Sequence, residues 1–158
     1  MTETAWVLLA YRMPREPSTP RITVWRKLRR LGAVQLVDGL VALPADAATV
    51  EAFDWLAEEV VDAGGEAWTW KGQPGSKAQQ RTLQARLTSS VADEYRALIA
   101  EAKGAEADPS RRTIERLRRE LHRVEGRDHF GPKEREQARR AVEHLAAARD
   151  AVQAEPAK

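Results

Sequence analysis

A run of arginines in the second half of the chain has the residue type and the spacing needed to bind a polyanion. Four of them recur at intervals of three and four residues: Arg112, Arg116, Arg119 and Arg123. On an α-helix these four side chains fall within an arc of roughly 60° and span about 17 Å. Guanidinium groups spaced in this way can contact about two or three phosphates of one nucleic-acid strand. We therefore predict a phosphate-binding face here, which we call the arginine stripe.

The same arginines also fit a simpler interpretation, a solvated helix face. Glu115 and Glu120 flank the arginine stripe and are placed to pair with Arg119 and Arg116. Charged runs on helices are commonly neutralised in this way. Both interpretations stay open from the sequence, and the solvated face is the more common case.

A second group of cations lies on a helix predicted over residues 20–31. Its members are Arg21, Arg26, Lys27, Arg29 and Arg30. They lie on the side away from Val24 and Leu28, the predicted core positions of this helix. Of these cations, the candidate nucleic-acid-binding residues are Arg26, Arg29 and Arg30.

The next predicted helix carries an acidic face, made of Glu51, Asp54, Glu58, Glu59 and Asp62. The basic and acidic helices can neutralise each other or present opposite charges to a partner. Trp55 stands among these carboxylates, where an exposed indole indicates a covered surface. We predict that Trp55 lies in an interface, covered by the C-terminal helices of this chain or by a second subunit. The other tryptophans are expected in the core or packed on the sheet.

The sequence offers little for catalysis. No cysteine occurs among the 158 residues, which excludes disulfides, thiolate metal sites and cysteine nucleophiles. His122, His129 and His144 are spaced too widely for a compact metal motif. No Ser-His-Asp arrangement, glycine-rich phosphate loop or carboxylate pair is visible. We expect a protein that is not an enzyme and has no catalytic residue, metal or cofactor.

The composition changes near Gly72. All five tryptophans precede it, and the rest of the chain is rich in alanine, arginine and glutamate. Residues 1–72 hold 8 Lys and Arg against 10 Asp and Glu, whereas residues 73–158 hold 18 against 14. The segment Gln73-Pro74-Gly75-Ser76 predicts a turn at the junction. We therefore predict one domain over residues 1–72 and a helical extension over residues 73–158, packed on the domain or on a second subunit.

Residues 1–72 are predicted to follow the order βαββαβ. Apolar runs predict strands over residues 5–13, 33–37, 40–43 and 66–71, with helices over 20–31 and 46–63. Gly32 is placed to end the first helix, Asp46 to cap the second, and Asp38-Gly39 favours a type I′ turn. The order indicates an α+β fold of the ferredoxin-like type, with both helices on one face of an antiparallel sheet.

The first predicted strand is apolar on both sides. Trp6, Leu8 and Ala10 alternate with Val7, Leu9 and Tyr11. A strand of this kind belongs to a sheet that is covered on both faces. About three helices are predicted afterwards, over residues 77–103, 109–124 and 132–152, each with one apolar stripe. The stripe of the third runs from Ala138 to Val152. We expect these helices or a second subunit to cover the open face.

Several segments carry a resemblance to a known protein family. The first extends from Trp6 to Pro14 and is followed by Glu16-Pro17-Ser18, Trp25-Arg26-Lys27-Leu28 and Leu31-Gly32-Ala33. Further along, Leu117-Arg118-Arg119 precedes the motif Arg127-Asp128-His129-Phe130-Gly131. Over residues 5–145 the chain resembles the N-terminal region of the ChrB family of chromate-resistance regulators.

The resemblance implies a transcription regulator linked to chromate resistance that contacts DNA through basic helices. DNA and a second copy of the chain are the candidate partners. Longer members of the family continue into a domain associated with chromate handling, so we expect this chain to bind chromate only weakly, if at all. A protein-interaction module without DNA binding is the alternative.

A metal-dependent nuclease is the third hypothesis. The first 70 residues also resemble the ferredoxin-like module of PaaX-type repressors and of the small CRISPR adaptation nuclease. That nuclease carries an acidic metal ligand near the end of its first strand, where this chain has Tyr11-Arg12-Met13. The chain has no apolar run of about 18 residues and no signal-like start at Met1-Thr2-Glu3, which predicts a cytoplasmic protein without a membrane segment.

Overall fold

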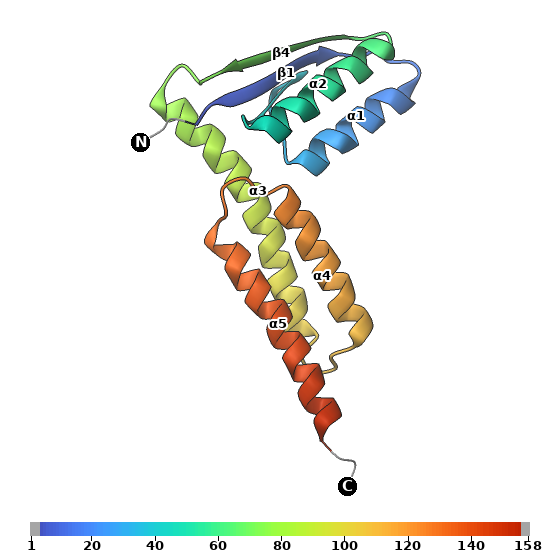
Figure 1. Cartoon of the computed structure of the whole chain (residues 1–158), viewed down its shortest axis with the longest axis vertical. Coiled ribbons are helices and arrows are strands. Elements are labelled where there is room, and N and C mark those ends of the chain that lie inside the picture. Colours follow the sequence, from blue (N-terminus) through green and yellow to red (C-terminus); the bar gives the residue numbers. More distant parts are fainter. Residues whose placement is uncertain (1–3, 156–158) are drawn as a thin grey trace. The chain divides into compact units, whose positions relative to one another are not determined.

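The order of helices and strands confirms the predicted α+β fold (Figure 1). The computed structural model describes residues 4–155; residues 1–3 and 156–158 lie outside it, and with them the start of the chain used in the signal-peptide argument. The first six elements are β1 (Trp6–Arg12), α1 (Ser18–Leu31), β2 (Val34–Val37), β3 (Leu40–Pro44), α2 (Ala47–Asp62) and β4 (Glu66–Gly72). Three helices follow: α3 (Lys77–Gly104), α4 (Arg111–Gly126) and α5 (Lys133–Ala154). Two compact units comprise residues 1–87 and 88–158, so the first turns of α3 group with the sheet.

Four strands form one antiparallel sheet in the order β2-β3-β1-β4. β1 is flanked on both sides, since Leu8 lies opposite Ala42 of β3 and opposite Trp70 of β4. One face of this sheet packs on α1 and α2. The buried residues on that side are Val7, Leu9, Val24, Leu28, Val41, Leu43, Phe53, Leu56 and Val60. The predicted core positions of α1, Val24 and Leu28, therefore lie against the sheet.

The other face of β1 is also covered, although less completely. Trp6 is 1% exposed, and its indole Nε1 donates a hydrogen bond of 2.9 Å to Oε1 of Gln80 near the start of α3. Ala42 is buried, and Leu8 and Ala10 are half-buried. Residues 77–87, about three turns of α3, belong to the same compact unit as the sheet. The first turns of α3 thus supply the cover that the apolar second face of β1 requires.

Four tryptophans differ from Trp6 in their exposure. Trp25, Trp55, Trp68 and Trp70 are 51%, 65%, 60% and 63% exposed. The expectation that the other tryptophans are packed is therefore wrong for Trp25, Trp68 and Trp70. On β4 the reason is geometric: Trp68 and Trp70 lie on the same face as Leu8 and Ala10, but on an edge strand.

Local sequence signals determine where most elements begin and end. Asp46 caps α2 as predicted: its Oδ1 accepts a hydrogen bond of 2.8 Å from the Thr49 backbone N–H, and Thr49 Oγ1 accepts one of 2.9 Å from the Asp46 N–H. Gly32 ends α1 in the left-handed conformation, with φ 76°. The helix begins at Ser18 rather than at Pro20, because Pro17 occupies the N-cap position.

The turn between β2 and β3 differs from the predicted type. A type I′ turn needs positive φ at both central residues, but among the described residues other than glycine none has positive φ, and only Gly39 of this pair does, at 75°. The end of β1 lies against this turn. Gly39 O accepts a hydrogen bond of 2.8 Å from Tyr11 N–H, and a Cβ at Gly39 would stand 2.5 Å from Tyr11 O. A register shift between Gln35 and Val37 accommodates the altered turn.

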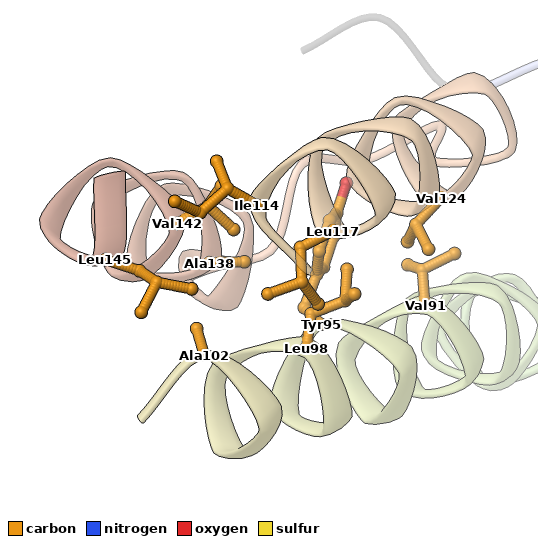
Figure 2. Close-up of a cluster of buried hydrophobic side chains, with 10 residues drawn as sticks. All are labelled: Val91, Tyr95, Leu98, Ala102, Ile114, Leu117, Val124, Ala138, Val142 and Leu145. Carbon is orange, nitrogen blue, oxygen red and sulfur yellow. The ribbon is translucent and has the colours of Figure 1, made fainter. Parts of the chain in front are cut away.

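The second unit has a hydrophobic core of its own, to which α3, α4 and α5 contribute (Figure 2). Its buried members are Val91, Tyr95, Leu98, Ala102, Ile114, Leu117, Val124, Ala138, Val142 and Leu145. They come from the three predicted apolar stripes, so in this unit the stripes pack on one another. Val152 is the exception: it is 65% exposed, so the third stripe ends before it.

We predict that Leu117→Ala destabilises the helical unit. Leu117 has no exposed surface and lies in the shared core, so truncation leaves a cavity and lowers the free energy of unfolding by about 2–5 kcal/mol. Val152→Ala is the matched control on an exposed position, with an expected change within about 0.5 kcal/mol. Urea denaturation followed by circular dichroism measures both. Equal effects of the two substitutions would contradict this core.

Candidate nucleic-acid interface

The arginine stripe lies on α4, and its four side chains are exposed. The helix begins after Ser110, whose Oγ accepts a hydrogen bond of 3.1 Å from the Thr113 backbone N–H. On the other side, Ile114, Leu117 and Val124 are buried and anchor the helix. The apolar and basic residues of α4 are thus separated onto different sides, as the sequence predicts.

Two of the four stripe arginines are already neutralised. Arg116 forms an ion pair with Glu101 of α3, and this hydrogen bond raises the pKa of Arg116 above its ordinary value. Arg123 Nη1 lies 3.0 Å from Glu120 Oε2. Arg112 and Arg119 have no ion pair within 4.0 Å among the described residues. The arginine stripe therefore offers two unpaired cations rather than four.

The predicted partners of the flanking glutamates are wrong. Glu115 pairs with Arg111 at 2.8 Å instead of with Arg119, and Glu120 pairs with Arg123 instead of with Arg116. Arg111 lies four residues before Glu115 and Arg119 four residues after it, so helical spacing brings both arginines within reach of this carboxylate, although the order with Glu first is the more favourable one. The pKa of Glu115 is lowered mainly by its hydrogen bond to Arg111, with a smaller effect from the charge of Arg119. Helical spacing alone leaves such choices undetermined.

Among the described residues, more of the basic residues on α1 than on α4 lack an ion pair. Arg26, Arg29 and Arg30 are exposed, and none has an ion pair within 4.0 Å in the part of the chain that the structure describes. On a regular helix the three side chains span an arc of about 100°. The guanidinium carbon of Arg29 lies 5.0 Å from the centroid of the Trp25 ring, within range of a cation–π interaction. We call these three residues the α1 arginine cluster.

The acidic face of α2 neutralises only a small part of α1. Lys27 Nζ lies 2.8 Å from Glu59 Oε2, and within residues 4–155 this is the ion pair that joins the two helices. The predicted neutralisation is thus limited to Lys27. Trp55, on the same acidic face, is 65% exposed, and its Nε1 donates a weak 3.5 Å hydrogen bond to Glu51 Oε1. Its place in an interface stays a prediction.

The motif Arg127-Asp128-His129-Phe130-Gly131 forms a polar turn between α4 and α5. Asp128 Oδ1 accepts hydrogen bonds of 3.2 and 2.8 Å from the backbone N–H groups of Phe130 and Gly131. Its Oδ2 accepts one of 2.8 Å from the hydroxyl of Tyr95 on α3, and the Asp128 side chain is fully buried. Gly131 provides the positive φ of 59° that the turn needs. One carboxylate therefore ties together all three helices of this unit.

Arg127 strengthens the same connection. Its Nε donates to both carboxylate oxygens of Glu94 on α3, each at 3.0 Å, and its Nη2 also contacts Glu94. The hydrogen bonds to Glu94 raise the pKa of Arg127. Arg127 also donates a hydrogen bond of 3.3 Å to the backbone carbonyl of Arg123. Arg127 therefore has a structural role within the helical unit.

No group of three or more His, Asp and Glu side chains in the described chain is placed to hold a metal ion. Across residues 4–155, none of the helices combines the length and the apolar character required to cross a membrane.

The fold and the surface define an α+β protein with a ferredoxin-like unit that presents three exposed arginines of α1, without ion pairs among the described residues, to solvent. Residues 21–111 match the model of the family described as "Protein ChrB, N-terminal", and this match covers more than half of the chain. The chain belongs to that family, as its resemblance in sequence predicted. The matched range includes the α1 arginine cluster and ends at Arg111, before the arginine stripe.

A comparison with curated proteins leads to the same family. Protein ChrB of Cupriavidus metallidurans is 31% identical to this chain over 103 residues, which are 65% of this chain and 31% of that protein. The chain thus matches less than a third of the length of this relative. No solved structure matches the chain significantly.

The Tyr95–Asp128 hydrogen bond is expected to make the stability of the helical unit sensitive to alkaline pH. Burial, and then the bond to Asp128, raise the pKa of Tyr95 above its ordinary value of 10.0. A group whose pKa is higher in the folded than in the unfolded protein contributes its full stabilisation at a pH below its unfolded pKa. That contribution is lost as the pH rises towards the folded pKa. The free energy of unfolding should therefore fall above about pH 10, and fall less in Tyr95→Phe. Urea denaturation at about pH 8 and about pH 11 tests this; an equal fall in both proteins would contradict it.

Proposed function

We propose that this chain acts in a ChrB-like regulator linked to chromate resistance, that it contacts DNA through phosphate groups, and that it is not an enzyme. The observation that carries the proposal is the α1 arginine cluster. Arg26, Arg29 and Arg30 are exposed, lack ion pairs among the described residues and lie in the range matched to the family. A phosphate backbone can therefore bind them without displacing an existing carboxylate.

The geometry of α1 suits a phosphate backbone. Arg26 and Arg30 lie one turn apart, about 6 Å along the helix axis, so that they can contact neighbouring phosphates of one strand. Arg29 rests near the Trp25 ring, which limits its rotamers and reduces the entropy lost on binding. Contacts to phosphates position a protein on DNA and carry no sequence information of their own. The α1 arginine cluster thus accounts for affinity rather than for operator choice.

The arginine stripe on α4 takes a smaller part in this proposal. Arg112 and Arg119 are open to a phosphate. Arg116 and Arg123 must first give up Glu101 and Glu120, which offsets much of what a phosphate contact would contribute. We therefore assign the DNA contact first to α1 and second to Arg112 and Arg119.

A protein-interaction module without DNA binding is the second candidate. Its support is Trp55, an indole 65% exposed on the acidic face of α2. A large exposed aromatic beside carboxylates is suited to a basic or apolar protein partner. In this case the arginines would be solvated charges, and DNA affinity would be weak and insensitive to their removal.

We predict that Arg26→Gln with Arg30→Gln lowers the slope of log affinity against log salt by about two units, because two phosphate contacts are lost. Arg116→Gln with Arg123→Gln removes the same charge from paired positions and should lower the slope by less than about one unit. Fluorescence anisotropy with a labelled DNA duplex over a range of salt concentrations measures both.

Arg15→Gln with Arg81→Gln is the matched control, because these arginines are exposed and lie outside both basic surfaces. If all three double variants change the slope equally, only the net charge matters and the assignment to α1 is wrong. If the unmodified chain shows no salt-dependent affinity for DNA, the protein-interaction module replaces the DNA proposal, and Trp55→Ser becomes the variant to test.

Chromate is expected to bind this chain weakly or not at all. The chain has no thiol that chromate could oxidise, and exposed arginines attract a dianion only through a field that salt screens. Isothermal titration calorimetry in about 0.15 M salt should show no saturable heat at micromolar chromate. Salt-resistant micromolar binding would contradict this expectation.

A further inference from the structure

A pocket of about 430 Å³ lies between the second face of the sheet and the first turns of α3. All of its lining residues belong to the compact unit of residues 1–87. The strands contribute an apolar floor, made of Trp6, Leu8, Leu36 and Ala42. Its volume and apolar floor are typical of sites for small molecules.

The pocket follows from how α3 covers the sheet. The indole of Trp6 is hydrogen-bonded to Gln80, which places a large side chain between the strand and the helix. Farther along the same sheet face, Ala42 offers only a methyl group, and Leu83 is the buried helix residue of the lining. A bulky contact beside a small one leaves space that these side chains do not fill.

One edge of the pocket is positively charged. Arg86 is the charged residue of the lining, and among the described residues its guanidinium has neither an ion pair within 4.0 Å nor a hydrogen bond. Two amide side chains lie along the same lining, Gln73 and Gln79. Gln79 Oε1 accepts a hydrogen bond of 3.1 Å from Gly75 N–H, which leaves its NH₂ group available as a donor. An acidic group placed at Arg86 would meet the one cation of the lining, without a competing carboxylate there.

We propose that this pocket binds an organic anion with a compact aromatic or branched apolar body, whose acidic group pairs with Arg86. The apolar body lies against Trp6 and Leu8, and the anion replaces the water around an otherwise unpaired guanidinium. Chromate does not fit this description, since it has no apolar part and the floor offers it no donors. The site is independent of the α1 arginine cluster and stands whether or not that cluster binds DNA.

Two dyes with nearly the same ring system distinguish binding of the apolar body from pairing of the acidic group with Arg86. Anilinonaphthalene sulfonate carries the anion, whereas phenylnaphthylamine lacks it. Both should bind the full chain saturably, with a rise in dye fluorescence. Arg86→Gln should weaken the sulfonate by at least about fivefold and change the neutral dye by less than about twofold. Arg81→Gln, on the same helix but outside the lining, should change neither.

A second variant tests the location. Thr82 lines the pocket from an exposed helix position, and its hydroxyl bonds only to the Ala78 carbonyl of its own helix. Thr82→Trp should fill the space and abolish saturable binding of both dyes, with an unchanged circular dichroism spectrum. Trp68→Ser with Trp70→Ser removes exposed indoles outside the lining and should leave both dyes bound.

Four outcomes would overturn the proposal. The first is saturable binding that survives Thr82→Trp. The second is binding lost in the Trp68 and Trp70 variant, which would place the dyes on the exposed indoles. The third is an equal loss in Arg86→Gln and Arg81→Gln, which would reduce the effect to net charge. No saturable binding of either dye to the unmodified chain would also contradict it.

Discussion

The fold of residues 1–87 depends on one strand, β1, that is apolar on both faces and flanked by a strand on each side. Other elements must therefore cover both faces of this strand to exclude water. α1 and α2 cover Val7 and Leu9, and the first turns of α3 cover Trp6. Because α3 continues to Gly104, the same helix also supplies Tyr95 and Leu98 to the core of the helical unit. The cover over the second face is incomplete, which leaves both the apolar pocket and the exposed indoles of β4.

The motifs that link this chain to its family differ in what they do. The Asp128 side chain is buried, bonded to two backbone N–H groups and to Tyr95, so the motif Arg127-Asp128-His129-Phe130-Gly131 holds the α4–α5 turn. Trp25 and Arg26 of the segment Trp25-Arg26-Lys27-Leu28 are exposed on α1. The resemblance to the family therefore includes residues with a structural role in the α4–α5 turn and exposed charged residues on α1. The proposed DNA contact uses only the latter.

Sequence patterns predicted the order of elements, the cap at Asp46 and the apolar stripes of the helices, because each depends on neighbours within a few residues. They did not predict features that depend on contacts between residues far apart in the sequence. Arg116 pairs with Glu101 of another helix, and Tyr11 restricts the turn at Gly39. The period-two alternation places Trp68 and Trp70 on one face of β4, and the register of β4 with β1 puts that face on the side of Trp6. Their exposure could not be predicted, since it depends on how far α3 extends over the sheet.

The start of α3 covers the second face of β1 at Trp6. The five indole N–H groups report on it directly in a nitrogen–proton correlation spectrum of the full chain, with Trp6 assigned from Trp6→Phe. Trp6 is buried and bonded to Gln80, whereas the other four indoles are more than half exposed. On transfer to deuterated water we expect the Trp6 indole proton to exchange far more slowly than the other four. Equally fast exchange of all five would contradict the account, because it would leave that face of β1 open to water.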